Sequence, residues 1–313
     1  MSYTPKLIGS GTYGCVVKPP IKNNIVNIKK KYTNKENDDV GKLFKTTKNV
    51  IKEAINEYMT YKKSVENIKY YNKIAPKIKG YNIISSIDNN DINSCIINNN
   101  NDNYIHQLIY ENAGITFKDY PFYELNYKKL IKMIKDFFTY FEYYVKAGKI
   151  HNDINNGNIM IKNNRIVLID FGLEKDKKTI FDKKYSKFFN HDYIFYSPEF
   201  RLLYLQLEQH SKDVNVHFGF SNFKDLINPL YGNFDIMTKK YILKEIESLI
   251  NDFSTDYSKI DIFSIGVNLY LIRDKIIFDT KKEYNDYNYL IKKMIEPNHK
   301  KRFSISEIIK YAS

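Results

Sequence analysis

The chain has 313 residues, of which 43% are hydrophobic and 15% are aromatic, enough to bury a substantial core. Its formal net charge is +13 at pH 7, but the lysines are spread through every segment and the chain contains only four arginines. Such scattered charge argues against a dedicated nucleic-acid-binding face. No stretch approaches the ~20 apolar residues of a membrane span or forms a signal peptide, so we expect a soluble, intracellular protein without a membrane partner.

The N-terminal third reads as strands with one helix, and the remainder reads mostly as helices, which predicts an α+β fold in two lobes. Residues 6–20 indicate a strand, a glycine turn and a second strand. Residues 23–32 indicate a third strand, residues 46–71 a long helix and residues 104–110 a further strand. The Asn-rich run at 88–103 is typical of a surface loop. The lobe boundary is expected near Ala113.

The segment 125–150 predicts a long amphipathic helix. Its apolar residues recur with the spacing of one buried face, at Leu130, Ile134, Phe137, Phe141 and Val145. Gly148 is expected to end the helix. The two cysteines, Cys15 and Cys95, are too few and too distant to predict a zinc site or a disulfide framework, and both are interpreted as small buried residues.

A glycine-rich motif lies near the N-terminus. The segment "GSGTYGCV", Gly9 to Val16, fits GxGxxGxV between two strands, where missing side chains let backbone amides approach phosphates. The dinucleotide-binding version needs a helix directly after the glycines, but "CVVK" continues as a strand. A flexible hairpin over a nucleotide triphosphate fits the motif, and an ordinary hairpin fits this motif alone equally well.

Further motifs follow in a fixed order: "VNIK" at 26–29, "HNDINNGN" at 151–158, "DFG" at 170–172, "SPE" at 197–199, "DIFSIG" at 261–266 and "EPNHKKR" ending at Arg302. The series resembles the eukaryotic protein kinase family from Leu7 to Ile309. The resemblance implies a single bilobal kinase domain over 1–313, with a small β-rich N-lobe at 1–112 and a larger helical C-lobe at 113–313. It also implies that ATP and Mg²⁺ bind between the lobes.

The resemblance assigns functional residues. Asp153 would accept or orient the proton of the attacking hydroxyl, while Asn158 and Asp170 would hold Mg²⁺. Lys29 would contact the α and β phosphates, paired with Glu57; Glu53 and, for the lysine, Lys30 are the alternatives. The remaining nucleotide contacts would come from Ile8, Gly9, Gly11, Gly14, Val16, and the backbones of Glu111 and Ala113 after Tyr110, which would limit access to the adenine pocket.

Other residues resemble the framework of that family. His151 is expected to pack beside Phe171 rather than to act as an acid or base. Asp261 is expected to accept backbone hydrogen bonds from the catalytic loop. Glu199 and Arg302 are expected to form a buried ion pair.

The chain departs from the family pattern at three catalytic positions. Asn152 stands where the family has an arginine, so activation by phosphorylation of the activation loop is not expected. Asn155 and Asp192 replace the lysine and threonine of the serine/threonine signature. The segment between Glu199 and Asp261 is also long, which indicates an insertion at about 205–258 that either shapes substrate recognition or fills out the large lobe.

These features together predict an ATP-dependent protein kinase that phosphorylates serine or threonine hydroxyls of protein substrates. Two alternatives stay open. The chain could be a catalytically weak pseudokinase that acts as a scaffold, although Lys29, Asp153, Asn158 and Asp170 are all present. It could also phosphorylate an atypical or small-molecule acceptor.

Overall fold

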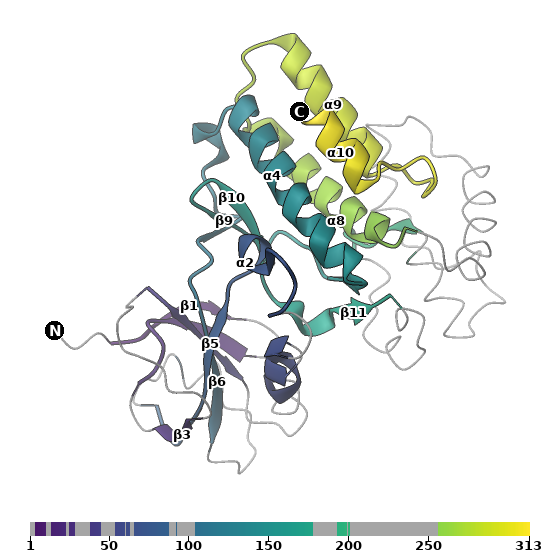
Figure 1. The fold of residues 1–313 in the computed structure, drawn as a ribbon. Helices are drawn as coiled ribbons and strands as arrows, with labels where there is room; N and C mark the ends of the chain where they lie inside the picture. The colour runs from purple at the N-terminus through teal and green to yellow at the C-terminus, as the bar shows by residue number, and fades with distance from the viewer. Residues whose placement is uncertain are drawn as a thin grey trace, which may run out of the picture. The chain divides into compact units, whose positions relative to one another are not determined.

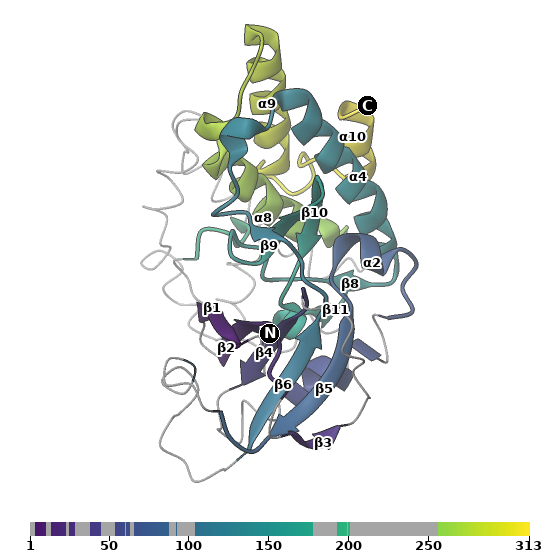
Figure 2. The same ribbon diagram turned by 90° about the vertical axis from the view of Figure 1, so that its left-hand side faces the viewer.

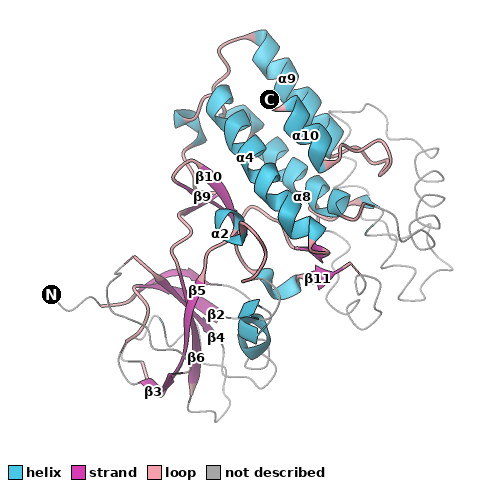
Figure 3. Ribbon diagram, viewed as in Figure 1, coloured by secondary structure: helices cyan, strands magenta, loops and turns pink. Residues whose placement is uncertain are grey.

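A computed structural model describes residues 4–10, 14–22, 25–28, 38–44, 54–59, 61–62, 66–87, 92, 104–177, 193–198, 200 and 256–313. The chain divides into two compact units, Met1–Gly114 and Ile115–Ser313. Strands dominate the first unit and helices the second (Figure 3). The predicted α+β class is confirmed. The expected insertion falls almost entirely outside the described residues.

The first unit is built on a six-stranded sheet in which the neighbours are antiparallel. Its order is β1-β2-β4-β6-β5-β3. The strands are β1 (Lys6–Ser10), β2 (Gly14–Lys18), β3 (Ile25–Ile28), β4 (Val40–Phe44), β5 (Ile78–Ile84) and β6 (Ile105–Tyr110).

The strand expected third in the sheet lies elsewhere. β3 forms the edge beside β5, whereas β4, which sequence patterning missed, pairs with β2. Periodicity gave no strand there, because β4 reads VGKLF and holds a glycine and a lysine in its centre. Gly41 is required, since a Cβ there would lie 2.5 Å from the Gln107 side-chain oxygen.

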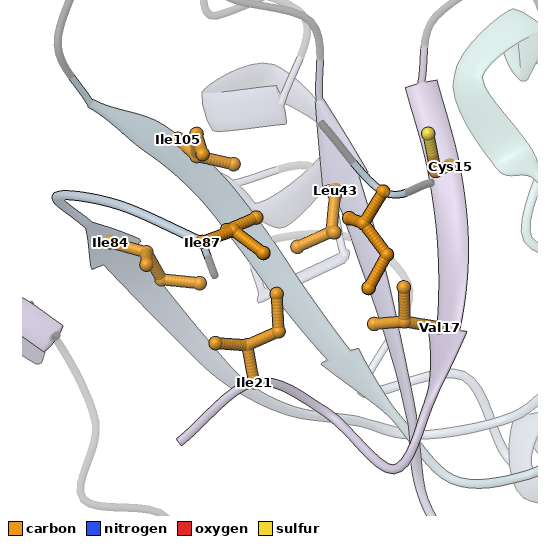
Figure 4. Packing of buried hydrophobic residues seen from close by; sticks show 8 residues of the cluster. Cys15, Val17, Ile21, Leu43, Ile84, Ile87 and Ile105 are labelled. Carbon is orange, nitrogen blue, oxygen red and sulfur yellow. The ribbon is translucent and has the colours of Figure 1, made fainter. Parts of the chain in front are cut away.

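One face of this sheet carries an aliphatic cluster (Figure 4), formed by Cys15, Val17, Ile21, Leu43, Ile84, Ile87, Ile92 and Ile105. Buried Gln107 exchanges two hydrogen bonds with the backbone of Ile21, at 2.8 and 2.9 Å, and fixes the chain after β2. Cys15 is fully buried, as expected, but it is disulfide-bonded, which was not predicted. Cys95 lies outside the described residues.

The helix predicted over 46–71 is shorter in the structure. Residues 54–59 are helical, but residues 66–70 form turns and bends, and a separate short helix α2 spans Tyr71–Ile74. Tyr70 has φ 62°, a left-handed conformation that a continuous α-helix does not allow. The apolar pattern continues across this break, so periodicity alone could not reveal it.

The second unit packs helices around two small sheets. β10-β9-β7 form one sheet and β11-β8 the other. Its elements are β7 (Ile115–Thr116), η2 (Phe122–Glu124), α4 (Tyr127–Lys146), β8 (Lys149–Ile150), β9 (Ile159–Lys162), β10 (Arg165–Leu168), η3 (Phe171–Leu173), β11 (Lys175–Asp176), α8 (Ser258–Leu271), η6 (Arg273–Lys275), α9 (Lys281–Met294) and α10 (Ile305–Tyr311). α4, α8, α9 and α10 lie side by side in both views (Figures 1 and 2).

Helix α4 confirms the predicted amphipathic helix. Asn126 caps its N-terminus by accepting a hydrogen bond from the Lys129 amide at 3.0 Å. Gly148 follows its end with φ 79°, the left-handed conformation typical of a residue that ends a helix. Within the described ranges, no helix is both long and apolar enough to cross a bilayer.

Candidate active site

In the N-terminal unit, the glycine motif forms a hairpin between β1 and β2, with Gly9 opposite Val16. Gly14 is required by packing, because a Cβ there would lie 1.8 Å from the Leu43 carbonyl oxygen. Ile8 is 55% exposed. Gly11 lies outside the described residues.

Lys42, in the centre of β4, is a partly buried lysine of this unit. It lies beside Val16 of the glycine hairpin in the sheet register. Its ammonium contacts both carboxylate oxygens of Glu57, at 3.0 and 3.2 Å, and the two side chains are only 17% and 9% exposed. The Tyr110 hydroxyl also donates to Glu57. The Tyr110 hydroxyl therefore helps to orient the glutamate, a contact that was not predicted from the sequence.

The expected pairing of Lys29 with Glu57 stays a prediction, but the lysine that the structure shows on this carboxylate is Lys42. The strand that leads to Lys29 lies at the far edge of the sheet, whereas β4 is adjacent to the hairpin strand β2. "VNIK" matched the expected pattern, but the order of strands in the sheet decides which lysine approaches the hairpin. Lys29, Lys30 and Glu53 lie outside the described residues.

The connector after β6 contains Glu111 and Ala113. The Glu111 amide donates to the Lys77 carbonyl at 2.9 Å, so this N–H group is already committed within the unit. Ala113 is buried, and the Asn112 side chain accepts a hydrogen bond from the Gly114 amide at 2.9 Å, which shapes the turn. A purine at this connector would therefore use the Ala113 backbone rather than the Glu111 amide.

In the C-terminal unit, a short ladder aligns the two acidic motifs. β9 and β10 pair from Ile159↔Leu168 onward, and the ladder extends by one bond from the Ile169 amide to the Asn158 carbonyl at 2.9 Å. Asp170 follows directly, with φ 60°. The hairpin thus brings the end of the segment 151–158, the catalytic loop, beside Asp170.

Three neutral groups donate hydrogen bonds to the carboxylate of Asp153. Oδ1 accepts from Asn155 Nδ2 at 3.1 Å and from the Tyr193 hydroxyl at 2.9 Å, while Oδ2 accepts from Asn158 Nδ2 at 2.9 Å. Burial raises the pKa of Asp153 to about 6, and the nearby charge of Asp170 acts in the same direction, against the lowering effect of the three donors. This carboxylate can therefore accept a proton near neutral pH.

Asn158 and Asp170 have the chemistry of a Mg²⁺ site. Asn158 commits its amide nitrogen to the Asp153 carbonyl and carboxylate, both at 2.9 Å, which leaves its oxygen as the ligand atom. Among the described residues no cluster of three His, Cys, Asp or Glu could hold a metal ion alone. One carboxylate and one amide oxygen fit Mg²⁺, which completes its shell with water and phosphate oxygens.

His151 packs beside Phe171, as predicted, with ring centroids 4.6 Å apart. The ring is fully buried, and burial lowers its pKa to about 4, so the imidazole is neutral. Its Nδ1 accepts from the Asp153 amide at 3.3 Å, and its Nε2 donates to the Ile169 carbonyl at 3.1 Å. This neutral ring therefore links the catalytic loop to the segment before Asp170.

Asp261 anchors the catalytic loop, as predicted. From the first turn of α8 it accepts the amides of His151 at 2.9 Å and Asn152 at 3.0 Å. Burial raises the pKa of Asp261 to about 7 despite these two bonds. Asn152 is buried with φ 65°, a left-handed conformation that asparagine tolerates well. The predicted ion pair of Glu199 with Arg302 stays a prediction, because Glu199 lies outside the described residues. The Arg302 guanidinium donates to the carbonyls of Lys259 and Glu296 at 2.8 and 2.9 Å.

The sequence reading missed three further residues of these sites. Lys149 bridges buried Glu174 at 3.2 Å and Asp176 at 2.9 Å, where β8 meets β11. Tyr193 contacts Asp153, but it lies one residue beyond Asp192, the position expected from the motif, and Asp192 is not described. Lys42 carried no motif of its own.

Two comparisons with known proteins each cover part of the chain. Residues 110–195 match the ABC1 atypical kinase-like domain. A stretch of 107 residues is 29% identical to the probable serine/threonine-protein kinase irlC of Dictyostelium discoideum. That stretch is 32% of this chain and 7% of the relative, so the similarity concerns a small part of that protein. The ABC1 match includes Asp153, Asn155, Asn158, Asp170 and Tyr193.

Proposed function

We propose that this chain, a divergent kinase-like protein, transfers the γ-phosphate of Mg-ATP to serine or threonine hydroxyls of proteins. The observation that carries the proposal is the Asp153 carboxylate, held by three neutral donors on a loop whose end lies beside Asp170. A buried carboxylate whose pKa is raised to about 6 can receive the proton of an attacking hydroxyl.

The chemistry divides between acidic and amide groups in the C-terminal unit. Asp153 would align the acceptor hydroxyl and take its proton as the oxygen attacks phosphorus. Asn158 and Asp170 would hold Mg²⁺, which neutralises charge on the phosphate oxygens when bound. Because phosphoryl transfer needs little covalent help, positioning and charge stabilisation are what these residues must supply.

The N-terminal unit would supply nucleotide contacts. Lys42, oriented by Glu57, would contact the α and β phosphates, in place of the lysine expected at 29. Gly9 would leave the hairpin backbone open to phosphate oxygens, whereas Gly14 is needed for packing against Leu43. The backbone of Ala113 would contact the purine.

Protein hydroxyls are the acceptor that the name of the Dictyostelium relative supports. Two observations favour a second class of acceptor. Asn155 stands where serine/threonine kinases normally carry a lysine, and residues 110–195 match an atypical kinase-like domain. A small-molecule acceptor is therefore the second candidate.

The proposal is tested with the full chain, γ-labelled ATP and Mg²⁺, offered first a mixed protein and peptide library and then pools of small hydroxyl compounds. We expect label on serine and threonine. Asp153→Asn should lower the rate by about 10²- to 10⁴-fold, the range for loss of a general base. Asp274→Asn, at a side chain 80% exposed on η6, is the matched control and should keep full activity.

Label found in small compounds but not in proteins would replace the protein acceptor with the second candidate. Equal activity of the wild type and Asp153→Asn would contradict the assigned base. No ATP turnover with any acceptor would leave a scaffold protein as the explanation.

A further inference from the structure

Tyr193 makes a contact that the proposed reaction does not yet use. Its hydroxyl donates to Oδ1 of Asp153 at 2.9 Å. The segment around it is well anchored: the Ser264 hydroxyl of α8 donates to the Phe195 carbonyl at 2.7 Å, and the Tyr196 amide donates to the Tyr193 carbonyl at 3.1 Å. The phenol is therefore held against the carboxylate by structure around it.

Aromatic packing fixes the ring as well. The Tyr193 ring lies edge-on to Phe195 and Tyr196, with centroids 5.2 and 4.8 Å away. Tyr196 belongs to a buried cluster with Ile150, Phe200, Tyr257 and Ile260, and Tyr193 packs against that cluster. Ile150 directly precedes the catalytic loop, so the same cluster supports both partners of the hydrogen bond.

The arrangement limits where an acceptor hydroxyl can bind. An ionised carboxylate offers about four lone-pair positions, and Asn155, Tyr193 and Asn158 occupy three of them. Two of these donors bond Oδ1 and one bonds Oδ2. The remaining position is on Oδ2, so Oδ2 is the atom that would meet the substrate proton.

Asn155 is fixed in the same way. Its side-chain oxygen accepts the amides of Gly157 at 2.8 Å and Asn158 at 3.2 Å, which directs its amide nitrogen toward Asp153. Asn155 and Tyr193 thus converge on one oxygen from two segments. Among the described residues, the charged or titratable groups that act on Asp153 are Asp170 and Tyr193, and the adjacent His151 is neutral.

We propose that Tyr193 is a positioning residue for Asp153, which together with Asn155 holds Oδ1 and presents Oδ2 to the acceptor hydroxyl. The inference rests on the proposed function, in which Asp153 is the base. Tyr193, which donates this hydrogen bond to Asp153, lies outside the motifs found in the sequence.

The test replaces the hydroxyl and keeps the ring. Tyr193→Phe removes one donor to the ionised carboxylate, so the pKa of Asp153 should rise. We expect the acid limb of the rate–pH profile to move up by about one pH unit, the size expected for one hydrogen bond to a charged group. The variant should then lose several-fold activity at pH 6.5 and recover much of it at pH 8.

Two variants separate this effect from disturbed packing. Tyr196→Phe changes the adjacent ring of the same cluster, and its hydroxyl is not among the three donors to Asp153, so its acid limb should stay in place. Asn155→Asp keeps the oxygen that accepts the Gly157 and Asn158 amides but turns the donor toward Asp153 into an acceptor. It should move the acid limb further than Tyr193→Phe does.

A readout without turnover keeps this inference separate from the proposed function. Carbon-13 NMR of labelled aspartate, assigned with Asp153→Asn, follows the Asp153 carboxyl through its titration in the full chain. A higher pKa in Tyr193→Phe supports the inference even when the wild type transfers no phosphate. An unchanged Asp153 titration and an unchanged acid limb in Tyr193→Phe would overturn it.

Discussion

Each unit of the molecule buries a lysine against a glutamate, but the surroundings of the two pairs differ. In the N-terminal unit, Lys42 and Glu57 are 17% and 9% exposed, and Lys42 bonds the Glu57 carboxylate. In the C-terminal unit, Lys149 and Glu174 are 8% and 2% exposed, and Lys149 also bonds Asp176. Both glutamates also accept a tyrosine hydroxyl.

We propose that the difference separates a ligand-binding pair, Lys42 with Glu57, from a structural one, Lys149 with Glu174. Lys149 joins β8, at the start of the catalytic loop, to β11 just after the DFG segment, and it has two carboxylates within 3.2 Å. Lys42 lies beside the glycine hairpin and is the more exposed of the two lysines. A second carboxylate and deeper burial therefore suit a framework, whereas the greater exposure of Lys42 suits an ammonium that meets phosphate.

The largest effect is expected at the structural pair. Lys149→Met leaves Glu174 buried without its cation, which should lower the free energy of unfolding by about 3–5 kcal/mol. Lys146→Met, three residues earlier at the end of α4, removes an exposed pair with Glu142 and should cost at most about 0.5 kcal/mol. Urea unfolding monitored by circular dichroism gives both values, and equal losses would remove the distinction drawn here.

The ligand-binding pair should respond in catalysis. Lys42→Met is expected to lower kcat/KM for ATP by about 10²- to 10³-fold, because it removes a cation aimed at the charge of the reacting phosphates. Lys29→Met should leave kcat/KM within a few-fold of the wild type. Steady-state kinetics with varied ATP measures both, and the reverse ranking would return the phosphate contact to Lys29.

The tyrosine hydroxyls give the smallest and most discriminating effect. Tyr144→Phe removes a 2.9 Å donor from Glu174 and should cost about 2 kcal/mol of stability, within the range for hydrogen bonds to charged groups. Tyr110→Phe removes the corresponding donor from the more exposed Glu57 and should cost about 1 kcal/mol. Thermal unfolding of the two variants, compared with the wild type, measures the ranking; a larger loss for Tyr110→Phe would contradict it.

The catalytic loop could be predicted because its contacts are local. Asp153 and Asn158 are five residues apart and bond directly, and a two-stranded ladder brings Asp170 to the end of the same loop. His151 was also placed correctly beside Phe171, whereas Asp261 reaches the loop from 110 residues away, and its contact was expected from the resemblance to the kinase family. The resemblance to the kinase family assigned Asp153, Asn158 and Asp170, and a single hairpin connects the two segments that carry them.

The lysine of the N-terminal unit could not be predicted in this way. Its identity depends on which strand lies beside β2, and the chain between β2 and β4 passes through β3, which joins the opposite edge of the sheet. "VNIK" carries a stronger strand pattern than "VGKLF", so local propensity favoured Lys29 over Lys42. Tyr193 was missed for a different reason. The threonine position of the serine/threonine signature aligns with Asp192, the residue directly before Tyr193.

Labelling with an acyl phosphate of ATP tests the central claim most directly, because the activated acyl group transfers to a lysine that lies at the nucleotide's phosphates. The full chain is labelled with and without excess ATP, and peptides are then mapped by mass spectrometry. We predict one ATP-protected label, on Lys42. A protected label on Lys29, or labels that excess ATP does not reduce, would contradict the account of this chain as an ATP-dependent phosphotransferase built around Lys42.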